Sequence, residues 1–350
     1  MKDKNDRIVL AIKSGINENR LSHMIDKKVA SGPFRRLLKT GVALPVVPYM
    51  YLTNRYAFRS LVHSTLLKKK FNYFPYMEIV LTTRCSLRCK YCANLMQYYE
   101  HPCDVPIGTL KRSVERLMEL TDSICELKLL GGEPFLYPHL AEMIEFCLLF
   151  EKKVQHIEIG TNGTVPIRDE RVWRLLQHKK IQLRVSDYGL GKVDSFCEQL
   201  EAHGVKYRRM KASEDLVWED CGKVYRRHRS VEELDAQFQN CSMFFRNILN
   251  GQLHICPRSS AGADLGLIPA KTDEYLNLLD DVHPVTKEQL FDYYYRDRHV
   301  TACDYCDNGT GKLPVVTAGK EQLQKSLYAQ AAAGNGNGGE EMKSRRGDSE

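Results

Sequence analysis

Three closely spaced cysteines constrain this 350-residue chain more than any other feature. Cys85, Cys89 and Cys92 follow the spacing C-x3-C-x2-C. Three thiolates placed in this way can ligate three irons of a cubane iron–sulfur cluster, and they leave the fourth iron open to a small molecule. A closed structural zinc site needs four ligands, so a zinc knuckle, the alternative, requires a fourth ligand elsewhere. The spacing therefore favours a reactive site over a purely structural one.

Two further motifs follow short predicted strands. The strand Glu126–Leu130 ends in Gly131-Gly132-Glu133-Pro134, and the strand at 155–160 ends in Thr161-Asn162-Gly163. Glycines at the end of a strand let the backbone come close to a ligand, and Asn-Gly is a turn signal. Both motifs therefore indicate ligand-binding loops at strand ends.

Together with Tyr91, directly before the last cysteine of the triad, these motifs resemble the radical S-adenosylmethionine (SAM) superfamily. The resemblance implies a [4Fe–4S] cluster on the three cysteines, with SAM bound at its open iron. It also implies an α/β fold, an open and partial (β/α)6 TIM barrel of the radical SAM type. In this family the Gly-Gly-Glu-Pro motif holds the amino group of SAM, so the implied cofactor-binding residues are Tyr91, Gly131, Gly132, Glu133, Pro134, Thr161 and Asn162.

The segment Ile181–Ser186 alternates between apolar and polar residues, as period-two strands do. Leu183 and Val185 point to one side, and Arg184 and Ser186 point to the other. Polar side chains on a buried strand are costly unless they face a wet or ligand-filled cavity; an edge strand with one solvated face is the alternative. We favour the cavity, with Ser186 near the SAM ribose and Arg184 near the SAM carboxylate or the substrate.

The end of this strand also supplies the candidate catalytic residues. Asp187 and Tyr188 lie just beyond the polar face, and they are the nearest candidates for a base beside the substrate carbon. With Arg184 they make up the expected catalytic set.

Strand and helix patterns alternate from about residue 73 to residue 240, and this rhythm predicts a parallel sheet. We divide the chain into a basic, mainly helical leader (1–72), a radical SAM core (73–240), a small α+β iron–sulfur domain (241–316), and a C-terminal part (317–350) with a weak helix, Lys320–Ala333, and a disordered tail. The predicted strands are Met77–Thr83, Glu126–Leu130, His156–Gly160 and Ile181–Ser186, and the predicted helices are Thr109–Thr121, His139–Glu151, Asp169–Lys179 and Asp194–Gly204.

A second cysteine set consists of Cys241, Cys256, Cys303 and Cys306. Four thiolates can fully ligate a second, auxiliary [4Fe–4S] cluster, or an all-cysteine zinc ion. The run 251–257 resembles the hairpin that carries auxiliary-cluster ligands in radical SAM enzymes. Four cysteines match the shorter, twitch version of the SPASM domain, and the arrangement resembles 2-deoxy-scyllo-inosamine dehydrogenase-type enzymes, which oxidise an aminocyclitol alcohol.

The five remaining cysteines have weaker patterns. Cys125 and Cys147 lie in apolar surroundings and are expected in the core. Cys103 and Cys197 have no partner pattern. Cys221 could replace one of the four second-set ligands or face the substrate, but we favour neither role. Cysteines in such short clusters suit metal better than disulfides inside a cell.

Charge is concentrated at the start of the chain, where residues 1–70 contain 15 Lys and Arg against four Asp and Glu. This leader could meet a membrane surface or an anionic carrier. The apolar stretch 42–52 could touch lipid, although we favour capping of the barrel. No stretch is long and apolar enough to cross a bilayer, and no signal peptide begins the sequence. We therefore expect a cytoplasmic protein, free or peripheral to the membrane, and no nucleic-acid partner.

The family resemblance also implies a reaction. An external one-electron donor of the flavodoxin or ferredoxin type reduces the first cluster, and SAM is cleaved to methionine and a 5′-deoxyadenosyl radical that takes a hydrogen atom from substrate. The auxiliary cluster then accepts an electron, which completes oxidation of an alcohol in a sugar- or cyclitol-like small molecule. The alternatives are a peptide-modifying enzyme (a RiPP maturase) or an epimerase within the same superfamily, or a non-catalytic zinc-binding protein.

Overall fold

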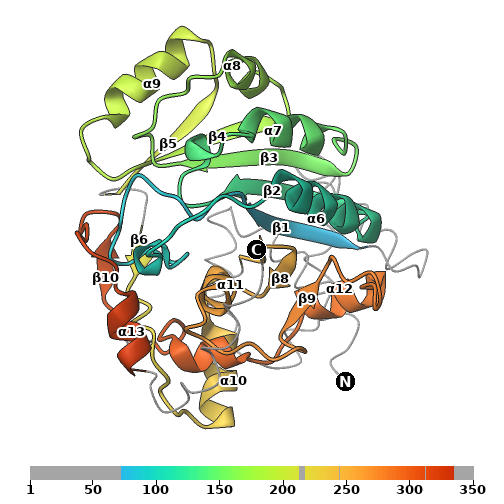
Figure 1. Ribbon diagram of the computed structural model, residues 1–350, viewed down its shortest axis with the longest axis vertical. Helices are drawn as coiled ribbons and strands as arrows, with labels where there is room; N and C mark the ends of the chain where they lie inside the picture. The colour runs from blue at the N-terminus through green and yellow to red at the C-terminus, as the bar shows by residue number, and fades with distance from the viewer. Residues whose placement is uncertain (1–71, 213–216, 244, 312, 335–350) are drawn as a thin grey trace, which may run out of the picture.

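A sheet of eight strands organises the molecule (Figure 1). The computed structural model describes residues 72–212, 217–243, 245–311 and 313–334. The strand order is β5-β4-β3-β2-β1-β7-β8-β9, in which β5 to β7 run parallel and β8 and β9 run antiparallel to their neighbours. The strands are β1 (Tyr73–Val80), β2 (Ser123–Leu130), β3 (Val154–Thr161), β4 (Ile181–Asp187), β5 (Tyr207–Lys211), β7 (Asn247–Leu249), β8 (Gln252–His254) and β9 (Tyr275–Asn277).

Four helices connect the parallel strands and pack against the sheet. Each crossover leads to the adjacent strand, so right-handed connections place all four helices on the same face. Helix α6 shows why they pack there, because Leu110, Val114 and Leu117 recur at helical spacing and are buried. With the inner side chains of the sheet they form the main core. The helices are α6 (Ile107–Leu120), α7 (Leu140–Leu148), α8 (Glu170–Leu176) and α9 (Val193–Ala202).

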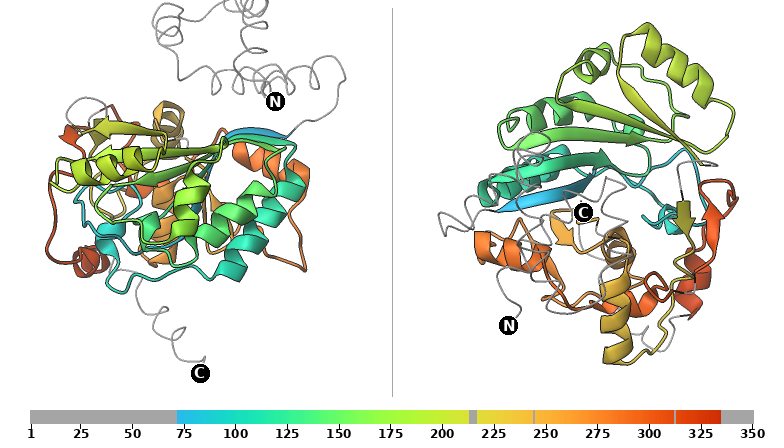
Figure 2. Two further views of the ribbon diagram at one scale, coloured as in Figure 1. Left: turned by 90° about the horizontal axis from the view of Figure 1, so that it is seen from above. Right: turned by 180° about the vertical axis from the view of Figure 1, so that it is seen from behind.

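The remaining elements lie below β1 in Figure 1 and in the right panel of Figure 2. A tight turn at Asn250 and Gly251, both with positive φ, joins β7 to β8. A Cβ on Gly251 would meet the Leu279 side chain at 2.5 Å. The elements of this part are β6 (Val217–Glu219), α10 (Val231–Asn240), α11 (Pro257–Asp264), α12 (Lys287–Tyr294), η3 (Thr301–Tyr305), β10 (Val315–Thr317) and α13 (Tyr328–Gly334). Two short 3₁₀ helices, η1 (Met96–Tyr98) and η2 (Pro134–Leu136), lie in loops of the core.

The α/β fold with a parallel sheet is confirmed. All four predicted strands and all four predicted helices are present, with bounds shifted by a few residues. The sequence missed β5 and β7. Strand β7 falls within the segment 241–316, yet it pairs in parallel with β1 and so adds a sixth parallel strand to the main sheet. That segment is therefore continuous with the barrel at this edge.

The predicted helix Lys320–Ala333 is wrong over its first part, because helix α13 begins only at Tyr328. Residues 321–323 instead pair with the backbone of the triad loop. The leader, whose helical structure was predicted, lies outside the described residues except for its last residue, and the tail beyond residue 334 also lies outside them. Within the described part of the chain, no helix is long and apolar enough to cross a membrane.

Candidate active site

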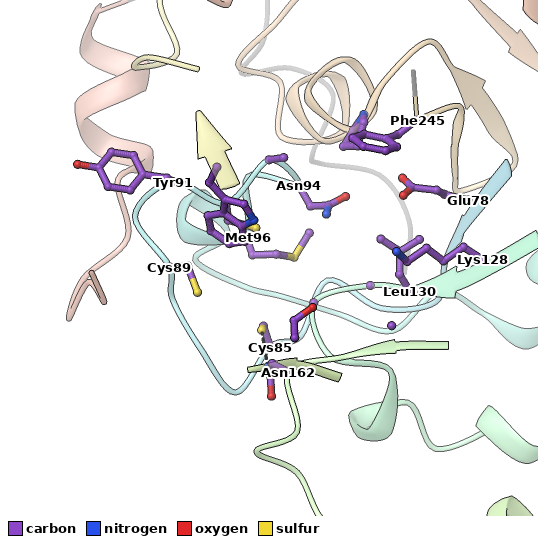
Figure 3. A pocket seen from close by; sticks show the side chains of 18 of the residues that line it. Glu78, Cys85, Cys89, Tyr91, Asn94, Met96, Lys128, Leu130, Asn162 and Phe245 are labelled. Atoms are coloured by element: carbon purple, nitrogen blue, oxygen red, sulfur yellow. Dashed lines mark hydrogen bonds between the residues drawn. The ribbon is translucent and has the colours of Figure 1, made fainter. Parts of the chain in front are cut away.

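A cavity of about 630 Å³ lies at the carboxyl ends of the parallel strands. Ligand sites of parallel α/β folds gather at this edge. The cavity brings together eleven of the residues that sequence assigned to the site: Cys85, Cys89, Tyr91, Cys92, Gly131, Gly132, Thr161, Asn162, Arg184, Ser186 and Tyr188. Figure 3 shows Cys85 beside Asn162, with Glu78 and Lys128 towards the other end of the cavity.

The loop that carries the triad cysteines is fixed by the loop after β2. The Gly132 amide donates to the Thr82 carbonyl at 2.8 Å, and the Glu133 amide donates to the Arg84 carbonyl at 2.8 Å. A Cβ on Gly132 would lie 2.2 Å from the Arg84 oxygen. The close approach that needs glycine here is therefore between two loops of the protein, in addition to any approach to a ligand.

Glu133 links loops and does not line the cavity. Its fully buried carboxyl accepts hydrogen bonds from the Thr161 hydroxyl (2.7 Å), the Asn162 amide (2.9 Å) and the Phe135 amide (3.2 Å). Burial raises the pKa of Glu133 to about 7, against the opposing effect of these donors. Pro134 begins η2 and is also absent from the cavity lining. Within the Gly-Gly-Glu-Pro motif, only the two glycines therefore face the cavity, while the glutamate holds neighbouring loops together.

The loop after β3 contacts the triad loop directly. Asn162 Nδ2 donates to Ser86 Oγ at 3.1 Å and lies 3.8 Å from Cys85 Sγ. Ser86 Oγ also shares a hydrogen bond of 2.7 Å with Thr164 Oγ1. The loops after β1, β2 and β3 therefore meet at the triad thiols. The sequence could only suggest this meeting from the order of the three motifs along the chain.

The three triad thiols fit a cluster by their chemistry and their surroundings. Burial is the main cause that raises the pKa of Cys89 to about 11 and also raises those of Cys85 and Cys92. Negative charge on Cys92 raises the pKa values of both Cys85 and Cys89, so the sulfurs are electrostatic neighbours. Bound iron would hold such thiols as thiolates. Among the described residues, no three His, Cys, Asp or Glu side chains are grouped as ligands of a single metal ion.

Strand β4 presents Arg184 and Ser186 to the cavity, while Asp187 lies among the buried residues of the opposite face. Arg209 donates to the Asp187 carboxylate at 2.9 and 2.7 Å. Burial opposes ionisation of Asp187, but the Gly189 amide and Arg209 outweigh it and lower its pKa. The expectation that Asp187 acts as a base beside the substrate is therefore wrong in geometry, because the alternation of the strand turns its carboxylate away.

Tyr188 lines the cavity, hydrogen-bonds with Ser186 and packs edge-on against Trp218 at a centroid distance of 5.4 Å. Burial raises its pKa well above the usual value. Its hydroxyl is therefore protonated at neutral pH and suits hydrogen-bond donation better than proton abstraction.

Tyr91 lies at the margin of the cavity. Its ring lies 4.8 Å from Lys90 Nζ, which pairs with Glu321 at 2.8 Å. Figure 3 shows the ring pointing away from Cys85 and Cys89. In this structure Tyr91 therefore supports the loop more than it faces the expected cofactor.

A charged floor of the barrel escaped the sequence analysis. Glu78 accepts from Tyr76 Oη at 2.6 Å and from Asn247 Nδ2 at 2.9 Å, and burial raises its pKa. Glu158 pairs with Lys128 at 2.8 Å and with Arg184 at 3.2 Å. Polar and apolar residues alternate in β1, β2 and β3 as they do in β4. This alternation could have placed these charged side chains on the same face of the sheet as Arg184, but the prediction applied it to β4 alone.

The second set of thiols lies behind the far end of the same cavity. Cys241, Cys256, Cys303 and Cys306 do not line it, but their chain neighbours Ser242, Met243 and Pro257 do. Burial raises the pKa of Cys241 to about 12 and that of Cys256 to about 11, and charge on Cys306 raises both further. The four thiols are thus gathered from 66 residues of sequence, between positions 241 and 306, into one region.

Cys221 joins this region, against the interpretation that it had no role there. It lines the cavity, and its Sγ donates to the Glu219 carbonyl at 3.7 Å. The neighbouring Cys221 thiol favours the thiolate of Cys306 and lowers the pKa of Cys306. Sequence could not assign Cys221, because it precedes the set by 20 residues without a recognisable spacing.

The surroundings of the second set are rich in buried cations. Arg258 donates to the Tyr305 carbonyl at 2.9 Å and to the Gly222 carbonyl at 2.7 Å. Arg246 donates to the Tyr294 carbonyl at 2.6 Å and to the Ile255 carbonyl at 3.0 Å. Both guanidinium groups belong to buried residues. Their positive charge is favourable to an anionic group between the thiols.

The other cysteines stay outside both sets. Cys147 is fully buried in the core as expected, whereas Cys125 is only partly buried. Cys197 is buried and Cys103 is exposed. All twelve cysteines of the chain lie in the described residues as free thiols.

Known proteins resemble parts of this chain. Residues 79–186 match the model described as the Radical SAM superfamily. The chain is 27% identical over 186 residues to the antilisterial bacteriocin subtilosin biosynthesis protein AlbA of Bacillus subtilis (strain 168), a match that covers 47% of this chain and 39% of that protein. It is 32% identical over 92 residues to the GTP 3′,8-cyclase of Syntrophomonas wolfei, covering 26% of this chain and 27% of that protein.

The matches therefore span less than half the length of these curated relatives. Among solved structures, that of BtrN in complex with AdoMet and 2-DOIA is similar with a TM-score of 0.43 and 15% identity, covering 74% of this chain and 96% of that chain.

Proposed function

We propose that this chain, whose residues 79–186 match the Radical SAM superfamily model, cleaves SAM reductively in the 630 Å³ cavity and removes a hydrogen atom from a small polar substrate bound there. One observation carries the proposal. The triad thiols, the glycine loop after β2, the loop after β3 and the polar face of β4 all line this one cavity, whose lining also includes Ser242, Met243 and Pro257, the chain neighbours of second-set cysteines. The favoured outcome is oxidation of an alcohol to a ketone.

Cys85, Cys89 and Cys92 would hold a [4Fe–4S] cluster that binds SAM. With an electron from an external flavodoxin- or ferredoxin-type donor, these bound groups would supply the radical chemistry that removes a hydrogen atom from the substrate. The Arg184 guanidinium meets a carboxylate of SAM or substrate with a charge-assisted hydrogen bond. Ser186 and Tyr188 offer hydroxyl donors on the same wall.

Cys241, Cys256, Cys303 and Cys306 would hold a second [4Fe–4S] cluster, which would supply an acceptor for one electron. Oxidation of the alcohol would then balance, because the substrate would lose a hydrogen atom to the deoxyadenosyl group, a proton to a cavity carboxylate such as Glu78, and an electron to this acceptor. Arg246 and Arg258 support this assignment, since their buried charges offset the negative charge of four thiolates and a cluster.

The floor of the cavity favours a polar, hydroxyl-bearing substrate such as a sugar or cyclitol. Glu78 and Lys128 can bond to hydroxyl or amino groups, and both line the cavity. The volume lies in the range of pockets for small molecules. We therefore propose that the substrate binds against this floor.

Modification of a peptide is the second candidate. The 27% identity to AlbA, a bacteriocin biosynthesis protein, favours it. A peptide would insert one side chain into the cavity and leave its backbone outside, whereas a cyclitol would be enclosed.

Anaerobically reconstituted protein tests the proposal. We expect iron and sulfide for two cubane clusters, formation of 5′-deoxyadenosine after reduction with dithionite, and a product two hydrogens lighter than the substrate from a panel of cyclitols and amino sugars. Bound zinc without sulfide would contradict the superfamily reaction. A new thioether, or a product isomeric with its substrate, would contradict the dehydrogenase reaction and leave SAM cleavage standing.

A further inference from the structure

A segment near the C-terminal end of the described chain, residues 319–328, lies along the triad loop; we call it the C-terminal strap. The Lys90 amide donates to the Glu321 carbonyl at 2.9 Å, and the Leu323 amide donates to the Arg88 carbonyl at 2.9 Å. Further along, Ser326 Oγ donates to the Tyr98 carbonyl at 2.8 Å. The strap therefore adds a short antiparallel pairing to the loop that carries Cys89 and Cys92.

Gln322 is the residue of the strap that reaches a triad sulfur. Its Nε2 donates to Cys89 Sγ at 3.1 Å and to the Gly319 carbonyl at 2.6 Å. Its Oε1 accepts from the Arg88 amide at 2.8 Å. Because the Arg88 amide can only donate, the oxygen end of the side chain must face it, and the nitrogen end must face the sulfur.

We propose that Gln322 is a positioning residue for the first cluster, and that it stabilises the reduced cluster by donating a hydrogen bond to the Cys89 thiolate. The inference rests on the proposed function, since it requires a cluster on the triad. Hydrogen bonds to ligating sulfurs help set the reduction potential of iron–sulfur clusters. The donor favours the more negative, reduced state, so its removal lowers the potential.

The same contact shields the ligand. Cys89 is only 7% exposed although Gln322 and Glu321 on the strap are exposed. Gly319, at the start of the strap, packs on the Tyr188 ring so closely that a Cβ there would lie 2.2 Å from the ring. The strap thus joins the cluster loop, from which it is more than 200 residues distant in sequence, to the β4 wall of the cavity.

Two substitutions of Gln322 and one matched control test the donor. Gln322→Leu removes both polar ends, and Gln322→Glu keeps the acceptor for the Arg88 amide but replaces the donor with a carboxylate. Glu321→Gln breaks the exposed Lys90–Glu321 ion pair of 2.8 Å and leaves the backbone pairing in place. The full-length, reconstituted proteins are titrated redox-potentiometrically with electron paramagnetic resonance detection, and the signal that changes on addition of SAM identifies the first cluster.

We expect a lower potential for Gln322→Leu, a still lower one for Gln322→Glu, and the wild-type potential for Glu321→Gln. Wild-type potentials in both Gln322 variants would overturn the inference, as would an equal shift in Glu321→Gln, which would mean that the strap as a whole and not the donor matters. Failure of the wild-type protein to show a SAM-responsive cluster would instead contradict the proposed function, so the two failures are distinguishable.

Discussion

The two cysteine regions differ in what surrounds their sulfur atoms. The triad cysteines line the cavity, and the nearest buried titratable group in the adjoining loop is the Glu133 carboxyl. The second-set cysteines lie behind the cavity, next to the buried Arg246 and Arg258 guanidinium groups. The triad region is therefore open to a ligand and has no buried cation among its described contacts. The second-set region is enclosed and lies next to buried cations.

This difference in charge indicates the direction in which an electron would pass between the two regions. A cationic, hydrogen-bonded environment stabilises the reduced state of a cluster, and a neighbouring carboxyl does not. The second region therefore suits acceptance of an electron, and the first suits donation of an electron to a ligand at the open iron. The comparison agrees with the proposed order of events, in which the electron enters at the triad and leaves at the second set.

The largest expected effect is the loss of the first region. Replacement of Cys85, Cys89 and Cys92 with Ala should abolish reductive cleavage of SAM, because no other described thiols face that end of the cavity. Production of 5′-deoxyadenosine after dithionite reduction measures it, and iron content should fall to that of one cluster. Cys103→Ala, which removes an exposed thiol, is the control and should keep full cleavage. Continued cleavage by the triple variant would disprove the assignment of the triad.

Loss of the second region should separate the two steps. Replacement of Cys303 and Cys306 with Ala should leave cleavage of SAM largely intact but stop oxidation of the substrate, because the electron has no acceptor. Cys221→Ser is the matched variant and should retain the iron of both clusters, since it is a neighbour of Cys306 and not one of the four ligands. Loss of the second cluster in Cys221→Ser would show instead that Cys221 is a ligand.

A smaller effect is expected on the wall between the regions. Arg184→Ala should weaken SAM or substrate binding by about 1.5–3 kcal/mol, as for a lost hydrogen bond to a charged group. Ser186→Ala should cost about 0.5–1.5 kcal/mol. Arg208→Ala is the control, because Arg208 is the exposed register partner of Arg184 on β5 and does not line the cavity. Isothermal titration of SAM binding measures all three, and equal affinities would show that the wall does not hold SAM.

The last expected effect is a pH dependence that comes from the buried carboxyl of the first region. Burial raises the pKa of Glu133 from 4.5 to about 7, so its contribution to stability is fully present below pH 4.5 and is lost as the pH rises through about 7. Relative to wild type, Glu133→Gln should therefore gain stability between pH 5 and pH 7.5, because the amide does not ionise. Thermal unfolding of both cluster-free proteins across this range measures the difference, and parallel pH profiles would contradict the raised pKa.

Much of the core followed from local patterns. The alternation of strand and helix segments predicted the four strands and four helices between residues 77 and 204, because apolar spacing of two or three to four residues is set by which face packs on the sheet. The polar face of β4 was read in the same way, and Arg184 and Ser186 do line the cavity. Asp187 was misplaced because it follows the polar face in sequence but alternates away from it in space.

Contacts without a local signal could not be read from the chain. The barrel floor of Glu78, Lys128 and Glu158 forms only when three separate strands pair in register. The proximity of Cys221 to Cys306 depends on the packing of the C-terminal elements.

The sequence by itself determined the chemistry available to this protein, since the spacing of three thiols within eight residues leaves little freedom in how they meet a cluster. The tertiary structure alone decided how the two thiol regions are tuned. The contact of Gln322 with Cys89 and the burial of Arg246 and Arg258 near the second set join residues far apart in sequence. The physical reason is that burial, charge and hydrogen-bond direction around a site belong to the assembled elements, whereas ligand spacing and periodicity belong to short stretches of chain.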